Sequence, residues 1–418
     1  MTNDLKQLFI TIKSSFWLLP MIMSTSGVIA AIFILDLDYM LQGLGLYSYF
    51  SSISMPIETV RLVLSTTAGA MITVVSLVFS MTLVALILVS QQLGPRILIQ
   101  FMDDLQTQIT LGLFNATFLF SLIVLVRIDT SASTDEVKGV VIIISVLLTI
   151  ASIITLIHYI HHLAKRIQAD VIVSELGSDL EKATRQYVRQ SQEIYDHIET
   201  DDYDELMQSF EAKAFYSVVM KNSGIIQQFN ETSAFKYAKE NNLIFVLKIT
   251  PGEFLLSGRP LMHVYQGETD EEVCEDKLEV LSAFFSVSKI RTPIASINFE
   301  INAITEVALR ALSPGVNDPQ TAVFCINQLA VGLMILMEVR NQPKVLKDDE
   351  DITRILYKKQ TYNSYLHQAF DGIIDACASN QLVKTHLAKI LDELSALGKS
   401  EGQQACFEKF RKQINIDQ

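Results

Sequence analysis

The sequence predicts an α-helical membrane domain of four transmembrane helices, followed by a soluble α+β cytoplasmic domain. Half of the 418 residues are hydrophobic, which is more than a simple soluble domain of this length is expected to carry. Four long stretches contain no Asp, Glu, Lys or Arg. Most of the charged residues follow the last of these stretches, so the chain divides into an apolar first part and a water-soluble remainder.

The four uncharged stretches are each about as long as a helix needs to cross roughly 30 Å of hydrocarbon. We expect the membrane domain over residues 1–166. The first stretch follows Lys6 and Lys13, as a secretory signal would, but it is too long for a signal core and no A-x-A-like site follows it. It is therefore expected to be retained as a span. The predicted spans are residues 16–35, 62–89, 109–126 and 139–157.

The charge distribution separates the two domains. Residues 1–166 hold 8 of the 33 Lys and Arg and 9 of the 46 Asp and Glu, so the net charge of −13 lies almost entirely in residues 167–418. A tail this acidic argues against nucleic acid as a partner. Its cysteines show no metal-ligand spacing and are expected to be reduced thiols: Cys274, Cys325, Cys377 and Cys406.

Positive charges near the spans predict the orientation of the chain, because they favour the cytoplasmic side. The segments expected inside carry five Lys or Arg and those expected outside carry three. This difference places both termini in the cytoplasm. The inside set is Lys6, Lys13, Arg96, Lys165 and Arg166, and the outside set is Arg61, Arg127 and Lys138.

Residues 167–418 are expected to alternate between helical and β segments. A helix is expected to continue past the last span, and another over about 202–220. Short runs of β-forming residues with the turns "TPGE" and "SGRP" then predict a small sheet over about 224–266, with one helix near 233–241. A helical part is expected over about 270–418, with helices near 270–285, 297–312 and 319–340 and two or three more before the end.

The stretch "RALSPGVNDP" predicts a rigid corner between two apolar helices. Pro314 and Gly315 end the first helix, while Asp318 followed by Pro319 is an N-cap and first-turn pair that begins the second. Glu306 and Arg310 are four residues apart and are expected to pair. Two interpretations remain open: caps and a salt bridge that hold a helical hairpin, or a loop in which Arg310, Asn317 and Asp318 gather a ligand.

The second span carries a stripe of small residues on one face, at about 100° per residue. Such a stripe is typical of the wall of a hydrated pore and equally of close helix packing in lipid. The same face continues as Leu83 and Ile87, a candidate hydrophobic gate. No span contains an ionisable residue, which argues against proton coupling and voltage sensing. The stripe consists of Ser65, Gly69, Thr73, Ser76 and Ser80.

Two features lie beside the spans. His158, His161 and His162 share one helical face just past the fourth span; with no Cys, Asp or Glu near them in the sequence, polar rings at a headgroup boundary are favoured over a metal site, and no metal or other cofactor is expected. The segment from Pro95 to Ile109 has apolar residues at helical spacing. It predicts either an interfacial helix or a plain amphipathic linker.

No catalytic pattern is present. The sequence contains no P-loop, no GxGxxG after a strand, no G-x-S-x-G elbow and no HExxH. The remaining histidines of the tail are isolated. We therefore do not expect an enzyme.

Three segments resemble a known family. "SQQLGPRILIQFMDDLQTQITLGLF" from Ser90, "TPGEFLLSGRPLMHV" from Thr250 and "RALSPGVNDPQTA" from Arg310 are similar to the bacterial predicted membrane proteins of domain of unknown function 2254. The resemblance implies four spans and a cytoplasmic tail in the bacterial inner membrane, and it supplies no reaction, substrate or cofactor. The matching positions are Gln91, Gln92, Gly94, Pro95, Arg96, Arg310, Ser313, Pro314, Asn317, Asp318 and Pro319.

Two functions are consistent with these features. The first is an oligomeric ion channel or channel-like protein of the inner membrane, whose cytoplasmic domain serves regulation or assembly. Four spans per chain are few for a complete pathway, and a closed homo-oligomer would supply the rest. The alternative is a membrane-anchored scaffold or sensor without a pore, which binds a cytoplasmic protein partner through its acidic tail.

Overall fold

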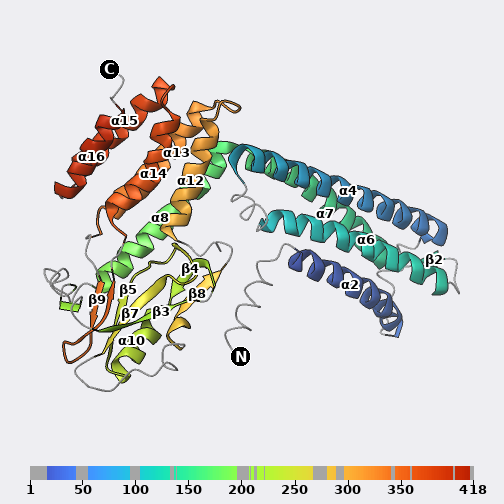
Figure 1. Cartoon of the computed structure of the whole chain (residues 1–418). Coiled ribbons are helices and arrows are strands. Elements are labelled where there is room, and N and C mark those ends of the chain that lie inside the picture. The colour runs from blue at the N-terminus through green and yellow to red at the C-terminus, as the bar shows by residue number, and fades with distance from the viewer. Residues whose placement is uncertain are drawn as a thin grey trace. The chain divides into compact units, whose positions relative to one another are not determined.

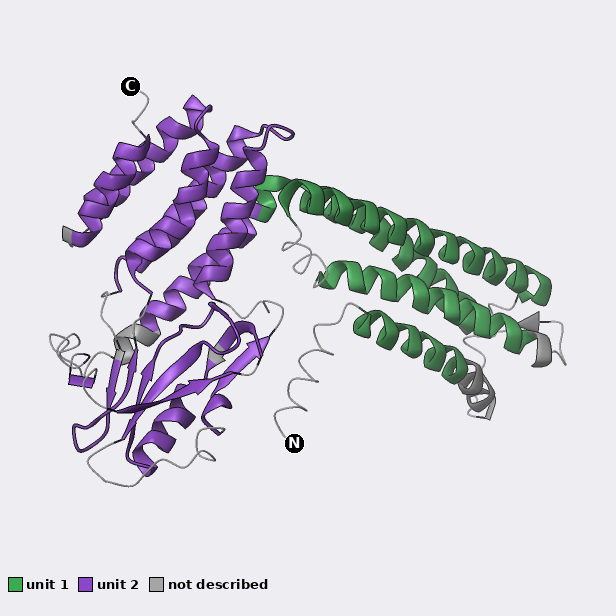
Figure 2. Cartoon of the chain, viewed as in Figure 1, with its two compact units in different colours: residues 1–172 green, residues 173–418 purple. Residues whose placement is uncertain are grey.

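The structure is a computed structural model of the chain. It describes residues 17–43 (side chains to 34), 55–94, 104–131, 136–137, 139–194, 207, 209–210, 214–220, 222–266, 280–288, 296–339, 344–357, 360–398 and 401–414. It divides into two compact units, residues 1–172 and 173–418 (Figure 2). The predicted boundary at 166/167 falls just before helix α8 (Ala169–Ile194), whose first residues belong to the first unit.

The first unit is built from four long helices, α2 (Leu18–Gly43), α4 (Ile57–Leu93), α6 (Leu105–Ser131) and α7 (Gly139–Arg166). Figure 1 shows them running side by side. Helices α4, α6 and α7 each cover one predicted span, α2 covers residues 18–35 of the first, and all four extend beyond the predicted spans at one or both ends. Helix α6 packs against the other three, so its Phe114, Phe120 and Val124 are completely buried. A two-stranded ribbon, β1 (Met55–Pro56) with β2 (Glu136–Val137), joins the loops before α4 and α7.

Four described helices are long and apolar enough to cross a membrane: α4, the Leu105–Ile128 part of α6, the Val141–Arg166 part of α7, and α13 (Pro319–Leu336) of the second unit. The described part of α2 that meets the same apolar criterion, Leu18–Ile34, is shorter. The sequence did not predict α13 as a span. Its apolar surface is instead in contact with other helices of the second unit, because α12 (Ile297–Ala311), α14 (Tyr362–Ala376) and α15 (Gln381–Leu397) pack around it.

The second unit contains a five-stranded mixed sheet in the order β3-β7-β5-β10-β9. The central strands β5 (Leu243–Leu247) and β10 (Thr353–Tyr357) are parallel, and the other neighbours are antiparallel. Every residue of β5 is buried, as expected of a strand covered on both faces. The edge strands are β3 (Phe215–Val219) and β9 (Lys344–Lys347), and β7 (Pro260–Gln266) lies between β3 and β5.

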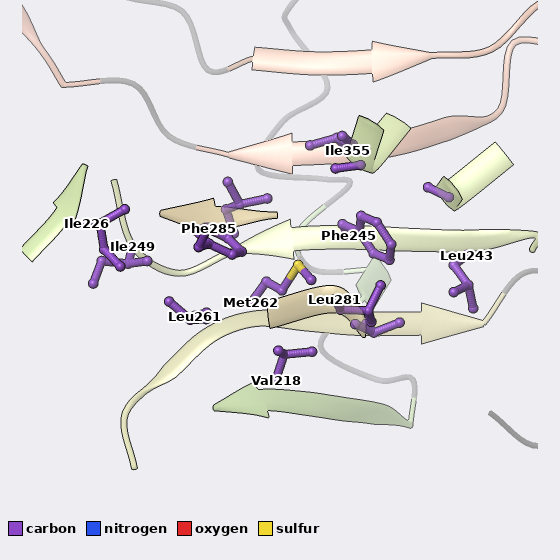
Figure 3. Packing of buried hydrophobic residues seen from close by; sticks show 14 of the residues in the cluster. Val218, Ile226, Leu243, Phe245, Ile249, Leu261, Met262, Leu281, Phe285 and Ile355 are labelled. Carbon is purple, nitrogen blue, oxygen red and sulfur yellow. The ribbon is translucent and has the colours of Figure 1, made fainter. Parts of the chain in front are cut away.

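One face of this sheet carries the larger apolar core, which Figure 3 shows from close by. Phe245, Met262 and Ile355 on neighbouring strands are completely buried, and Ala234 and Ala238 of α10 (Glu231–Glu240) belong to the same cluster. Figure 1 shows α10 beside the sheet. A smaller sheet of β6 (Phe254–Leu255), β4 (Gly224–Phe229) and β8 (Phe285–Ser288) completes the β part.

The predicted limits of the sheet were wrong at both ends. Strand β3 lies where a helix was expected over 202–220, and β8, β9 and β10 lie inside the part expected to be helical from 270 onward. Three of these strands pair with a partner that is distant in the sequence, β3 with β7, β8 with β4 and β10 with β5, whereas β9 pairs with the neighbouring strand β10. Pairing across the sequence overrode the local helical pattern.

The remaining helices agree with the prediction in type and order. Helices α12 and α13 meet at the corner motif, and α14, α15 and α16 (Glu401–Ile414) follow. Side-chain caps begin several of them: Ser296 accepts from the Phe299 N–H, Thr361 from the Ser364 N–H and Asn380 from the Val383 N–H. Of the segment predicted as an interfacial helix over 95–109, residues 95–103 lie outside the described residues and 105–109 form the start of α6. Cys274 and residues 270–279 of the helix predicted near 270–285 also lie outside the described residues.

Candidate functional site

The predicted stripe on α4 is exposed along its whole length. The face of α4 that packs inside the unit lies on the opposite side of the helix and includes Val60, Leu64 and Met71, each at most 5% exposed. Close packing against the described helices of the chain is therefore not the role of the stripe. Its exposed residues are Ser65, Gly69, Thr73, Ser76 and Ser80, and the candidate gate residues Leu83 and Ile87 are exposed beside them.

Two hydroxyls of the stripe bond to their own helix. The Thr73 hydroxyl donates to the carbonyl oxygen of Gly69 at 2.9 Å, and the Ser76 hydroxyl donates to that of Ile72 at 2.9 Å. Such bonds satisfy a hydroxyl in an apolar medium. A Cβ added at Gly69 would meet no atom within 4 Å. The stripe thus forms a shallow, small-residue surface that the described helices of one chain leave uncovered.

Close helix packing occurs instead between α2 and α6. A Cβ added at Gly27 would lie 2.8 Å from the carbonyl oxygen of Ala116, and one at Gly112 would lie 2.6 Å from Sδ of Met23. These two glycines let the helices approach closely, as small residues do in membranes. The sequence analysis missed this contact; the glycine in each of two separate apolar stretches is the signal that could have predicted it.

A polar cluster lies where α6 begins and α7 ends. Asp104, 7% exposed, accepts hydrogen bonds from the Thr107 N–H and hydroxyl and lies 3.1 Å from Nε2 of His162. Nε of Arg166 lies 3.8 Å from the other Asp104 oxygen. No acidic residue is near the histidines in the sequence, but antiparallel packing of α6 and α7 brings Asp104 to His162.

The side chains of His158, His161 and His162 have separate surroundings. His158 contacts the side chain of Gln106, His162 contacts Asp104, and His161 is exposed. Among the described residues, no group of three or more His, Cys, Asp or Glu is arranged to hold a metal. The cluster is an ion-paired connection between two helices.

Electrostatics stabilise the charged form of Asp104. Burial by itself raises the pKa of this carboxyl, but the hydrogen bonds from Thr107 and the electrostatic interactions with Arg166 and His162 outweigh burial and hold the pKa below its usual range. Asp104 is therefore ionised at neutral pH.

The corner between α12 and α13 is held by capping bonds. Asp318 accepts from the N–H and the hydroxyl of Thr321 at 3.2 and 2.6 Å, and its own N–H donates to the Ala311 carbonyl at 2.8 Å. Nη2 of Arg310 lies 3.3 Å from Glu306, and the Ser313 hydroxyl donates to the Arg310 carbonyl. Asn317 takes φ +48°, and Pro314 is exposed. These contacts provide the rigid turn that the capping interpretation requires.

A cavity of about 650 Å³ opens in the second unit. Three separate segments form it: the turn Thr250–Phe254, the first turns of α12 and the first turns of α14. The turn is of type II, because Gly252 follows Pro251 with φ +97° and the Glu253 N–H donates to the Thr250 carbonyl. The lining is mostly amide and hydroxyl: Thr250, Asn298, Asn302, Gln360, Thr361, Ser364 and Gln368, with Glu253 and Phe254 at the turn.

The carboxamides of the cavity are already ordered by one another. Nδ2 of Asn298 donates to Gln360 at 2.7 Å, Nε2 of Gln360 donates to Gln368 at 3.4 Å and to Ser364 at 3.2 Å, and Nε2 of Gln368 donates to the Asn298 carbonyl at 3.0 Å. The bonds close a ring through α12 and α14. Within the described part of the chain, the buried Oδ1 of Asn298 has no partner. The sequence analysis did not predict this site.

A buried carboxyl lies on α12 in the same unit. Glu300 is 8% exposed. Burial, with the nearby charge of Asp179 on α8, raises the pKa of Glu300 to about 7. The group therefore titrates near neutral pH.

The long apolar helices define a class of predicted membrane protein with candidate spans and a large second unit of mixed helices and strands. The comparison with known families is specific: the family model described as "Predicted membrane protein (DUF2254)" matches residues 13–393. The chain belongs to this family of predicted membrane proteins, as its motifs had suggested.

Relatives occur in mycobacteria. Uncharacterized proteins of Mycobacterium tuberculosis and Mycobacterium bovis are 25% identical to this chain over 338 residues. The matched region is 80% of this chain and 63% of each relative, so the chain matches less than two thirds of the relatives' length. No solved structure matches the chain significantly.

Proposed function

We propose that the chain is a channel-like protein of the bacterial inner membrane that works as a homo-oligomer. In this proposal α2, α4, α6 and α7 span the bilayer, both termini lie in the cytoplasm, and the second unit is the cytoplasmic domain that regulates or assembles the oligomer. The relatives are bacterial, and the charge bias around the predicted spans supports this orientation. The proposal assigns no chemical reaction to the chain.

The observation that carries the proposal is the exposed stripe on α4. Its glycine, serine and threonine residues are not used for packing against the described helices of one chain, although they form a continuous face over much of a span. A homo-oligomer would cover this face with another copy or arrange several copies around an axis. A pore lined by hydroxyl and backbone dipoles conducts without buried charge.

Leu83 and Ile87 would then form the apolar constriction of the pore. Both are exposed in one chain, at 46% and 55%. An apolar ring closes a narrow pore by excluding water, so a polar side chain at this position should hydrate it.

Reconstitution into planar bilayers tests the proposal. The full chain should pass ions, and Leu83→Ser should raise the basal conductance severalfold. Leu88→Ser is the matched control, because Leu88 is an exposed leucine about 100° away from the centre of the stripe. Bilayers that stay silent with both the wild type and Leu83→Ser, or an equal rise for Leu88→Ser, would contradict the pore.

The alternative is an anchored scaffold or sensor without a pore. Its support is that residues 173–418 form a compact unit with their own apolar cores, which a domain that binds a cytoplasmic protein requires. In that case the spans serve only for attachment. Replacing them with an unrelated anchor should then preserve cellular function and binding to one defined partner, whereas a channel would lose its function.

A further inference from the structure

The cavity in the second unit is a preformed polar site, and the channel proposal assigns it no ligand. Its volume of about 650 Å³ lies within the range of small-molecule sites in proteins, roughly 300–1,000 Å³. Rigid elements position its walls: a capped helix begins on each of two sides, with Ser296 and Thr361 as the caps, and a hydrogen-bonded type II turn forms the third.

The chemistry of the lining favours a ligand with both donors and acceptors. Asn298, Asn302, Gln360 and Gln368 each carry a carboxamide, and a carboxamide presents an N–H donor and a carbonyl acceptor in one plane. The ring of bonds between three of them fixes their planes before a ligand enters. Oδ1 of Asn298 is a buried acceptor that no described donor reaches. A buried acceptor without a hydrogen bond costs free energy, so a ligand that donates to it would be stabilised.

The charges of the lining argue against a multiply charged anion. Glu253 is the one charged side chain among the lining residues of the described chain, and it is negative. Its carboxylate accepts from the Thr250 N–H and hydroxyl. Arg259, whose Nη2 lies 3.8 Å from Oε2 of Glu253, is already paired with this carboxylate and is not among the described lining residues. A phosphate group would therefore meet the carboxylate without a described Lys or Arg in the lining to bind it. The helix N-termini still favour partial negative charge, such as a carbonyl oxygen.

The turn adds a flat apolar surface. Phe254 lines the cavity and is 55% exposed, so one face of its ring is available to a ligand. An exposed aromatic ring beside carboxamides is a combination that recognises a planar heterocycle, by stacking on its face and hydrogen bonding to its edge.

We propose that this cavity binds a small neutral ligand with a planar edge of donors and acceptors, the chemistry of a nucleobase or nucleoside. The inference goes beyond the channel proposal and does not depend on it, since the site lies wholly within the second unit and would serve a channel or a scaffold equally. A ligand in this position would bridge the Thr250–Phe254 turn to α12 and α14.

Calorimetric titration of the full chain in detergent tests the site, with adenosine, guanosine, cytidine and uridine in one arm. A second arm uses adenosine 5′-monophosphate, and a third uses glucose and maltose. We expect at least one nucleoside to bind with a Kd below about 1 mM, more tightly than its phosphate, and neither sugar to bind.

Variants locate the binding. Ser364 is exposed at the cavity, so Ser364→Trp should fill the site and abolish binding, while Ser379→Trp at an exposed position after α14 should leave it unchanged. Phe254→Ala, which removes a mostly exposed ring, should weaken binding about tenfold. The proposal is overturned if no nucleoside binds up to about 10 mM, if only a sugar binds, if the phosphate binds more tightly, or if Ser364→Trp has no effect.

Discussion

The carboxylate of Asp104 lies 3.1 Å from Nε2 of His162, a residue 58 positions later in the chain. Thr107 and Arg166 complete the surroundings of this carboxylate. The pair joins the beginning of α6 to the end of α7, the helix that precedes the second unit. Because Asp104 is nearly buried, its loss would leave His162 and Arg166 without their described acidic partner.

Replacing the Asp104 carboxylate should destabilise the first unit. We expect Asp104→Asn to lower the free energy of unfolding by about 1–3 kcal/mol at pH 7, because a charge-assisted bond to a partly buried group is lost. The pKa of Asp104 is lower in the folded state than in the unfolded state, so the stabilisation is present above the unfolded pKa and disappears as the pH falls through the folded one. Thermal unfolding in detergent, with exposed Asp170→Asn as the control, measures the difference. Equal melting temperatures for the two variants would refute this role of the pair.

Substitution by leucine should have different effects on stability at Gly27 and Gly69. Gly27→Leu places a side chain against the Ala116 backbone and should destabilise the unit by about 1–3 kcal/mol through overpacking. Gly69→Leu meets open space within one chain and should leave the monomer stable. If copies associate through the α4 stripe, Gly69→Leu should change the oligomer instead, which mass photometry or native mass spectrometry detects. A loss of monomer stability with Gly69→Leu would contradict the exposed position of the stripe.

Stability of the second unit should fall as the pH rises toward neutral. Folded Glu300 keeps its proton to about pH 7, whereas the unfolded carboxyl loses it near 4.5, so the folded state binds more protons between these values and the free energy of unfolding decreases with pH there. Glu300→Gln removes this dependence and should raise stability at pH 8 by about 2–3 kcal/mol. The exposed Glu408→Gln on α16 serves as the control. Melting curves at pH 5 and pH 8 that shift equally for wild type and Glu300→Gln would rule out this titration.

The corner motif allows its two interpretations to be separated. Asp318→Ala removes the cap of α13 and should cost about 1 kcal/mol, whereas Asn317→Gly keeps the positive φ of that position and should cost little. If Asn317→Gly abolishes cellular function at unchanged melting temperature, the loop gathers a ligand. If only Asp318→Ala has an effect, in proportion to the stability lost, the corner is structural.

Labelling from outside the cell tests the orientation of the tail. The described cysteines Cys325, Cys377 and Cys406 are buried, so a probe needs an exposed thiol. Ser379→Cys in a Cys274→Ser background provides one, since Ser379 is exposed. A membrane-impermeant maleimide should leave Ser379→Cys unlabelled in intact spheroplasts and label it after lysis. Labelling before lysis would place the tail on the outer side.

Local features of the sequence were sufficient for the long helices and the corner. Uncharged apolar stretches predicted α2, α4, α6 and α7, because the length and polarity of a spanning helix are properties of a contiguous segment. The N-cap pair Asp318 and Pro319 likewise acts within one turn, so the start of α13 could be predicted. Short runs of β-forming residues between turns predicted β4, β5 and β7 for the same reason.

The tertiary structure decided which distant residues meet. The sequence by itself placed the small-residue stripe on one face of α4, but only the packing of the helices showed that this face is exposed while Gly27 and Gly112 make the close approach. It also could not pair Asp104 with His162, align β10 with β5, or assemble one cavity from residues 250–254, 298–302 and 360–368. These contacts depend on how separate elements pack, and packing is a property of the whole chain that no local pattern encodes.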